Sequence, residues 1–430
     1  MTVSTASAAA GAPTATTDSV PAAVEPMSLK IPLTGVVVLL LQGLMALGAH
    51  GTTTFRFAVA SDFLRLGDAT LSARLVIIVA AGAVAAATAL ALVRARGRRR
   101  VPTWATAVIG VGFVIAFLAW VGAGRSGVIP LVTILSSALG LSVPLVYGSL
   151  AGIIGERSGT INIAIEGQLL GGAFLGAVVA SASSNPWMGL VAAPVAGVLV
   201  ALLLALFGLR YRVNQIVVGV VLNVLVSGLT GFLFSTFLSS SPSLNRALRL
   251  PTLAVPVLSR IPVIGPVLFR QTILVYLMYA VVAVLSYMLF RSRWGLRLRA
   301  CGEHPKAADT VGIKVMRTRV ANLALAGALA GLGGAFFTVG SGLSFDNDMT
   351  AGNGYIALAA MILGAWRPLG SLGAALLFGF ATSVAQTLPV IGSSVSPDII
   401  SMIPYIVTIL AVAGFVGRVR APAAEGVPYP

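Results

Sequence analysis

Polar side chains are concentrated in one short segment of an otherwise apolar sequence, GERSGTINIAIEGQLLGGAFLG at residues 155–176. Asn162, Glu166 and Gln168 supply amide and carboxylate groups, which donate and accept hydrogen bonds. On a helix that starts near Ser158, the residues Ser158, Asn162 and Glu166 lie four apart and form one polar stripe. An acidic side chain at membrane depth costs roughly 2.5–3.5 kcal/mol, so it is expected to face a solute pathway or a polar partner.

A second polar stripe repeats this spacing further along the chain, at Gly219, Asn223 and Ser227. Together the two stripes indicate a polar-lined route, with candidate residues Asn162, Glu166, Gln168, Asn223 and Ser227. Hydrogen bonding between packed helices explains both stripes as well. In that interpretation, Glu156 and Arg157 cap a short turn.

The Ser-Gly pair at 158–159 is a poor helix interior, because glycine costs about 1 kcal/mol there relative to alanine. The pair therefore predicts a broken or re-entrant helix near 155–176. The N-terminal amide groups of such a helix point into a cavity, as in the discontinuous helices of transporters.

The residues that catalysis or metal binding requires are missing from the sequence. None of the three lysines, Lys30, Lys306 and Lys314, lies in a Gly-Lys-Ser/Thr phosphate-binding loop. The twelve acids are scattered, the two histidines are far apart, and one cysteine with one nearby histidine is too few ligands for a metal site. We therefore expect no catalytic residue, no metal site and no bound cofactor in this chain, which is not predicted to be an enzyme.

The composition is that of an integral membrane protein, because 57% of the residues are hydrophobic, 9% are charged and the mean hydropathy is +0.99. Apolar segments close to the ~20 residues that cross a bilayer predict helices rather than the shorter strands of a barrel. The net charge of +16 comes from short loops between these segments, so it does not indicate nucleic-acid binding. The 48 glycines suit close helix packing in lipid, and Gly167/Gly171, Gly172/Gly176 and Gly327/Gly331 have small-xxx-small spacing.

The expected fold is an all-α polytopic membrane protein with about 10–12 transmembrane helices. The apolar segments lie at about 31–49, 75–93, 104–121, 131–154, 161–181, 189–209, 216–238, 272–290, 320–340, 352–366, 370–388 and 398–416. An even number of spans returns both ends of the chain to one side. Twenty of the 28 lysines and arginines then fall on the side of the N-terminus, which predicts cytosolic N- and C-termini.

Four regions follow from this pattern. Residues 1–28, rich in Ala, Ser, Thr and Pro, are expected to form a disordered cytosolic tail. Residues 29–101 form an additional N-terminal transmembrane hairpin with the basic loop RARGRRR, and residues 102–420 form the core. Residues 421–430 form a C-terminal tail.

The most charged segment of the core is residues 291–319, RSRWGLRLRACGEHPKAADTVGIKVMRTR, here called the charged loop. Pro305 followed by Lys-Ala-Ala-Asp predicts the start of a short helix, and Gly312 predicts its end. A short helix between basic strings is typical of a docking element. An ordinary positive loop that maintains orientation remains the alternative.

Three motifs in the core resemble a known family. RACGEHPKAADTVGI at 299–313 is similar to the coupling-helix segment of ABC importer permeases of the branched-chain amino acid and simple-sugar superfamily. The segments GERSGTINIAIEGQLLGGAFLGA at 155–177 and TAGNGYIALAAMILGAWRPLGSLGAALLFG at 350–379 resemble the core segments of its purine nucleoside branch. The resemblance covers roughly residues 130–417, and the N-terminal ~100 residues depart from it.

This resemblance implies a permease subunit of an importer in the bacterial cytoplasmic membrane, with a nucleoside as its substrate. It also implies three partners besides membrane lipid: a second permease, a cytosolic ATPase that binds ATP and Mg, and an external substrate-binding lipoprotein. The residues that would contact the ATPase are Gly302, Glu303, His304, Pro305, Ala307 and Ala308. Two alternatives remain open at this point: a permease for a simple sugar, and a proton-coupled secondary transporter with Glu166 as its proton site.

Overall fold

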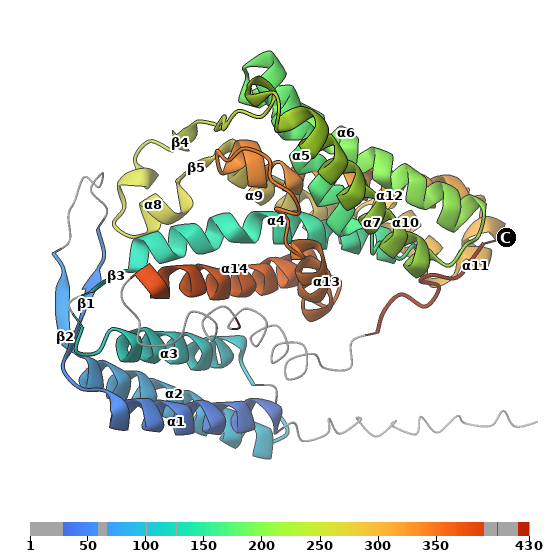
Figure 1. The fold of residues 1–430 in the computed structure, drawn as a ribbon. Coiled ribbons are helices and arrows are strands. Elements are labelled where there is room, and N and C mark those ends of the chain that lie inside the picture. Colours follow the sequence, from blue (N-terminus) through green and yellow to red (C-terminus); the bar gives the residue numbers. More distant parts are fainter. Residues whose placement is uncertain are drawn as a thin grey trace, which may run out of the picture. The chain divides into compact units, whose positions relative to one another are not determined.

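Helices form most of the chain in the computed structural model, which describes residues 29–58, 67–99, 101–125, 127–390, 402 and 420–429 (Figure 1). Within these residues, ten helices are long and apolar enough to cross a bilayer. The protein is therefore an all-α polytopic membrane protein, as predicted. One expected span is wrong, because 352–366 contains only the eleven-residue helix α13 (Asn353–Leu363), which is too short to cross. The expected span at 398–416 and the tail at 1–28 lie outside the described residues.

The chain divides into two compact units. The first unit contains α1 (Lys30–Gly48), α2 (Ala73–Arg96) and α3 (Thr103–Val121). The hairpin expected in 29–101 is thus accompanied by a third helix, and the unit extends to Trp120. Val84, Ala87 and Ile109 form its small core, and the Gln42 amide donates to the Gly112 carbonyl at 3.0 Å.

The second unit contains the remaining long helices. They are α4 (Leu131–Arg157), α5 (Ile165–Ser183), α6 (Pro186–Leu204), α7 (Gln215–Leu233), α9 (Ile273–Arg291), α12 (Val315–Gly334) and α14 (Pro368–Val390). Short π-helical segments continue α6 to Arg210, α7 to Leu238 and α12 to Gly340. Two short helices, α10 (Arg293–Glu303) and α11 (Pro305–Thr310), lie in the charged loop. The expected helix from Pro305 is therefore present, and Gly312 with φ +84° follows it as predicted.

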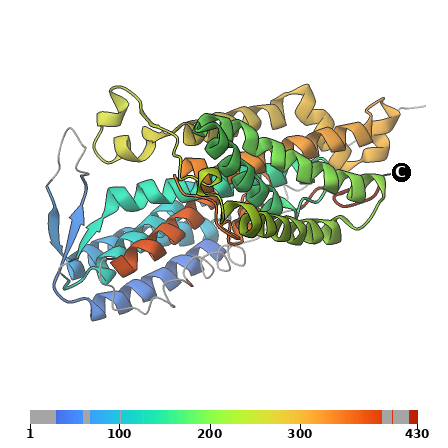
Figure 2. The ribbon, with the colours of Figure 1, turned by 45° about the horizontal axis from the view of Figure 1, so that its top comes forward.

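Short strands occur in the loops of the second unit. Strand β1 (Thr52–Arg56) pairs antiparallel with β2 (Ala69–Ser72) and parallel with β3 (Val128–Pro130), directly before α4. The blue β1–β2 ribbon projects beside the start of α4 in both views (Figures 1 and 2). Strands β4 (Thr252–Ala254) and β5 (Arg270–Thr272) pair antiparallel around the short helix α8 (Ile264–Leu268).

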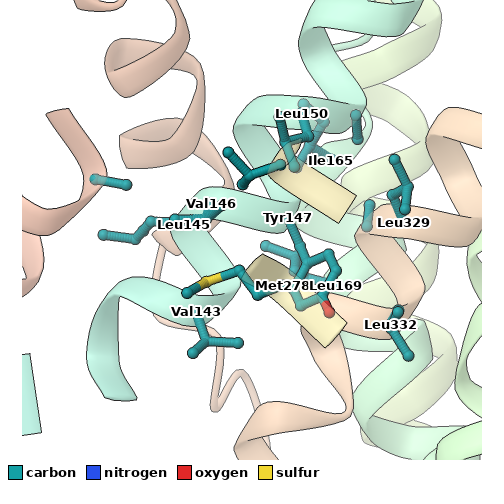
Figure 3. Packing of buried hydrophobic residues seen from close by; sticks show 14 of the residues in the cluster. Val143, Leu145, Val146, Tyr147, Leu150, Ile165, Leu169, Met278, Leu329 and Leu332 are labelled. Atoms are coloured by element: carbon teal, nitrogen blue, oxygen red, sulfur yellow. The ribbon is translucent and has the colours of Figure 1, made fainter. Parts of the chain in front are cut away.

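The core of the second unit lies around α4 (Figure 3). Tyr147 and Leu150 of α4 are fully buried against Ile165 and Leu169 of α5, among other apolar residues. The Tyr147 hydroxyl donates to the Leu274 carbonyl at 3.1 Å, so this polar group has a partner in its apolar surroundings. Helix α4 is thus the central element against which the polar segment packs.

Glycines bring α5, α6 and α12 into backbone contact. A Cβ atom on Gly172 would overlap the Gly331 carbonyl, and one on Gly327 would overlap the Gly197 carbonyl. A Cβ atom on Gly331 would overlap the Ala193 carbonyl. The close approaches expected from the small-residue spacing are therefore present at Gly172, Gly327 and Gly331, whereas a Cβ atom on Gly171 or Gly176 would meet its neighbours at ordinary contact distance.

Candidate functional site

The polar segment contains a break between two helices. Helix α4 ends at Arg157, residues 158–164 are not helical, and α5 starts at Ile165. Gly159 has φ +93°, a conformation that favours glycine, and it turns the chain back. The Ile165 side chain then lies beside Gly148 and Gly152, so the start of α5 packs against the C-terminal half of α4.

The predicted broken helix is therefore present, but the predicted polar stripe is wrong. Ser158 and Asn162 precede α5, so they share no helix face with Glu166. The Ser158 hydroxyl instead donates to the Gly155 carbonyl at 2.7 Å, which closes the end of α4. The spacing of four residues is meaningful only where the chain is helical.

Glu166 holds the start of α13. Its carboxylate accepts hydrogen bonds from Thr350 Oγ1 at 2.6 Å, Gly352 N at 2.8 Å and Gly354 N at 2.6 Å. The first amide groups of a helix have no partner within the helix, and a negative charge is favoured there. Glu166 of α5 thus caps α13 across the bundle, and the two helix starts lie side by side.

Asn223 holds the start of α5 in the same way. Its Oδ1 accepts from Gly167 N at 2.8 Å, and its Nδ2 donates to the Ile163 carbonyl at 2.9 Å. The same Nδ2 also donates to the Tyr355 hydroxyl at 3.1 Å. The second predicted stripe is on a real helix, since Gly219, Asn223 and Ser227 all lie on α7.

Two other candidate residues bond to each other within the break. The Asn162 and Gln168 side-chain amides exchange two hydrogen bonds of 3.1 Å, and both side chains are fully buried. Ile161 N donates to Gln215 Oε1 at 2.8 Å, which ties the break to the start of α7. These amides keep the non-helical backbone in one conformation.

Accessible polar groups lie next to the hydrogen-bonded starts of α5 and α13. The Ser227 hydroxyl donates to Asp348 Oδ1 at 2.6 Å, and Asp348 is exposed. Tyr355, at the start of α13, is 48% exposed. The sequence interpretation included Ser227 but missed Asp348, Tyr355 and Thr350, although the last two lie in the TAGNGY string that carried the resemblance.

The opposite end of α13 meets the end of α4. Glu156 Oε2 accepts from Trp366 Nε1 at 2.6 Å, and Arg157 Nε donates to the Trp366 carbonyl at 2.7 Å. The interpretation in which these two residues cap a local turn is therefore wrong, because their partner lies more than 200 residues away.

The charged loop presents some of its candidate residues and buries others. Glu303, His304 and Ala307 are exposed and Pro305 is partly exposed. Gly302 and Ala308 are buried within the chain, and a Cβ atom on Gly302 would overlap the Arg157 carbonyl. Residues 303–307 are therefore the part of the predicted contact that lies at the surface of the chain.

Among the residues that the structure describes, no three His, Cys, Asp or Glu side chains are grouped so that they could hold a metal ion. The polar groups of the site are amide, hydroxyl and carboxylate groups, which donate and accept hydrogen bonds.

Comparison with known proteins identifies the family of the chain. The family model described as "Branched-chain amino acid transport system / permease component" matches residues 134–412. The chain is 38% identical over 309 residues to the guanosine ABC transporter permease protein NupQ of Bacillus subtilis (strain 168), covering 69% of this chain and 96% of that protein. It is 39% identical over 306 residues to the nucleoside ABC transporter permease protein NupC of Lactococcus lactis subsp. cremoris (strain MG1363), with the same coverage of 69% and 96%.

A more distant relative carries a different substrate name. The glucose ABC transporter permease protein TsgB13 of Haloferax volcanii is 30% identical over 296 residues, covering 62% of this chain and 77% of that protein. No solved structure matches the chain. The family match spans the helix break, the charged loop and the start of α13, and the chain belongs to the family described as the permease component of the branched-chain amino acid transport system.

Proposed function

We propose that this chain is the membrane-spanning permease subunit of an ABC importer for nucleosides. The observation that carries the proposal is the pair of helix starts, α5 and α13, which lie side by side and are capped by Asn223 and Glu166. Discontinuous helices of this kind form the solute sites of many transporters. The relatives named for guanosine and nucleoside transport, at 38% and 39% identity, support the substrate class.

In this proposal the buried and the exposed polar groups have different tasks. The buried and partly buried groups hold the helix break and the two helix starts in place, because their described hydrogen bonds go to the protein. These groups are the side chains of Asn162, Gln168, Glu166 and Asn223. Ser227, Asp348 and the exposed ring of Tyr355 are available to a solute. A carboxylate is suited to the ribose hydroxyl groups, and an aromatic ring is suited to stacking on a base.

The charged loop is the proposed contact with a cytosolic ATPase. Its exposed residues Glu303, His304 and Ala307, with Pro305, would enter a groove of that subunit, while buried Gly302 and Ala308 hold the loop to its own chain. ATP and Mg would bind to the ATPase alone. The remaining proposed partners are a second permease and an external binding lipoprotein, and both termini are proposed to be cytosolic in a bacterial cytoplasmic membrane.

A simple sugar is the second candidate substrate, favoured by the relative named for glucose at 30% identity. Proton coupling through Glu166 fits the geometry less well. Three donors surround this carboxylate, so protonation would disrupt at least one bond at the start of α13.

Uptake of radiolabelled nucleosides in cells with and without the gene tests the proposal. We expect uptake that requires the gene, is blocked by excess nucleoside but not by pentose, and stops when ATP is depleted by an agent that spares the proton gradient. Uptake that survives ATP depletion and stops with a protonophore would instead indicate a proton-coupled carrier.

Replacing Ala307 with tryptophan should separate ATP hydrolysis from transport. Ala307 is exposed, so a large side chain is accommodated by the fold but obstructs a partner surface. In the assembled transporter we expect nucleoside uptake to fall about tenfold, within the usual range of coupling between sites. The control is Ala86→Trp, an exposed alanine on α2. Equal uptake by both variants would count against the proposed ATPase contact.

A further inference from the structure

The C-terminal segment (residues 420–429) lies between the charged loop and the helix break. It returns to the end of the bundle that carries α10 and α11, and Figure 1 shows it in dark red beside α11. Its backbone amides bond to both neighbours, as Ala424 N to the Gly302 carbonyl (2.8 Å), Gly426 N to the Gly159 carbonyl (3.2 Å) and Ala423 N to Glu303 Oε2 (3.2 Å). The segment thus bonds to the charged loop, which is the proposed ATPase contact. It also bonds to the helix break, which precedes the start of α5 at the proposed solute site.

Arg319 of α12 fixes the segment in this position. Its side chain is fully buried, and Nη1 donates to the Val427 carbonyl at 2.8 Å. Nη2 lies 3.4 Å from the carbonyl oxygens of Ala424 and of Cys301. All of these acceptors are backbone carbonyls, and two of them belong to the C-terminal segment. A buried cation needs such acceptors, so Arg319 and the segment depend on each other.

Gly159 shows how closely these groups fit. Any side chain there would place its Cβ atom 2.5 Å from Arg319 Nη2, and φ at Gly159 is +93°. On the other side of the segment, Gly426 has φ +70° and faces Ile161 of the break. The two glycines let the segment approach the break directly.

A second connection runs from the segment to α13. The Glu425 side chain lies near the Glu156 carboxyl, which accepts a hydrogen bond from Trp366 just beyond the end of α13. Burial raises the pKa of the Glu425 carboxyl. The other end of α13 is the one that Glu166 caps.

We propose that the C-terminal segment is a positioning element that carries displacement of the charged loop to both helix starts. One route passes through Gly302, Ala424 and Gly426 to Gly159 and the break before α5. The other passes through Glu425, Glu156 and Trp366 to α13. This inference rests on the proposed function, and the segment lies beyond the residues that the family match covers, 134–412.

The test compares the full transporter, reconstituted in vesicles, with and without residues 420–430. We expect the truncated form to continue to hydrolyse ATP while nucleoside uptake falls about tenfold, within the range of coupling between sites. Cys301, the one cysteine in the sequence, is buried with Tyr429 packed against its cluster. Its labelling by a maleimide should therefore become faster when the segment is removed, which reports undocking independently of transport.

Two substitutions keep the test decisive if the truncated protein does not assemble. Gly426→Val retains the segment but blocks its approach to Ile161, and it should reproduce both effects. Arg319→Gln removes the buried cation, and Arg317→Gln, at an exposed position on the same helix, is its matched control.

The outcomes separate this inference from the proposed function. If the full-length transporter does not take up nucleosides, the proposed function fails, and Cys301 labelling still reports whether the segment docks. If it does take them up, and Gly426→Val speeds labelling without reducing uptake per ATP hydrolysed, the positioning role is overturned. Unchanged labelling in the truncated protein would overturn the docking itself.

Discussion

Replacing Glu166 with glutamine should lower nucleoside uptake about tenfold and also lower the melting temperature of the purified protein. Glu166 accepts three hydrogen bonds at the start of α13, from Thr350, Gly352 and Gly354. A glutamine amide has one oxygen, and its NH₂ group would face a donor. A buried donor without an acceptor costs about 1–3 kcal/mol, and tenfold corresponds to about 1.4 kcal/mol.

The matched control is Asp346→Asn, which changes an exposed acid whose described bond is to the adjacent Asn347 amide. We expect that variant to retain both uptake and melting temperature. Melting is measured in detergent without substrate, so it reports the cap on α13 rather than substrate contact. Lost uptake with an unchanged melting temperature would show that Glu166 binds solute directly. If both properties were unchanged, the capping role would be contradicted.

Replacing Gly331 with alanine should destabilise the helix bundle more than any exposed glycine replacement. The added methyl group would overlap the Ala193 carbonyl and lie 3.1 Å from Pro194 Cα, so α6 and α12 would have to separate. Overpacking of this kind costs about 1–3 kcal/mol. For a chain of this size, that corresponds to a fall in melting temperature of roughly 1–3 °C.

Gly228→Ala on α7 makes the same chemical change where nothing lies within 4 Å of the added atom. Because alanine forms helices better than glycine, the melting temperature of the Gly228→Ala variant should be equal to or slightly above that of the original protein. Equal destabilisation by the two variants would contradict the close α6–α12 contact. Expression level and melting temperature should fall further for Gly331→Leu, since a larger side chain forces a wider separation.

The sequence by itself determined the class of the protein and the position of most helices. Apolar segments of about 20 residues have no other stable place than a bilayer, so hydropathy located the ten long helices. Local backbone preferences also sufficed at Gly159, where the helix breaks, and at Pro305, where a short helix begins. These features depend on residues close together in the chain.

Only the tertiary structure decided what the polar groups do. The partners of Glu166 lie 184–188 residues away, and the partner of Glu156 lies 210 residues away, distances at which no periodicity operates. The stripe predicted from Ser158 to Glu166 was wrong because four-residue spacing assumes a helix that the break interrupts. Exposure likewise depends on packing, which buries Gly302 and Ala308 but leaves Asp348 and Tyr355 accessible. Hydrogen bonds and burial are properties of surfaces that meet only after the helices have packed.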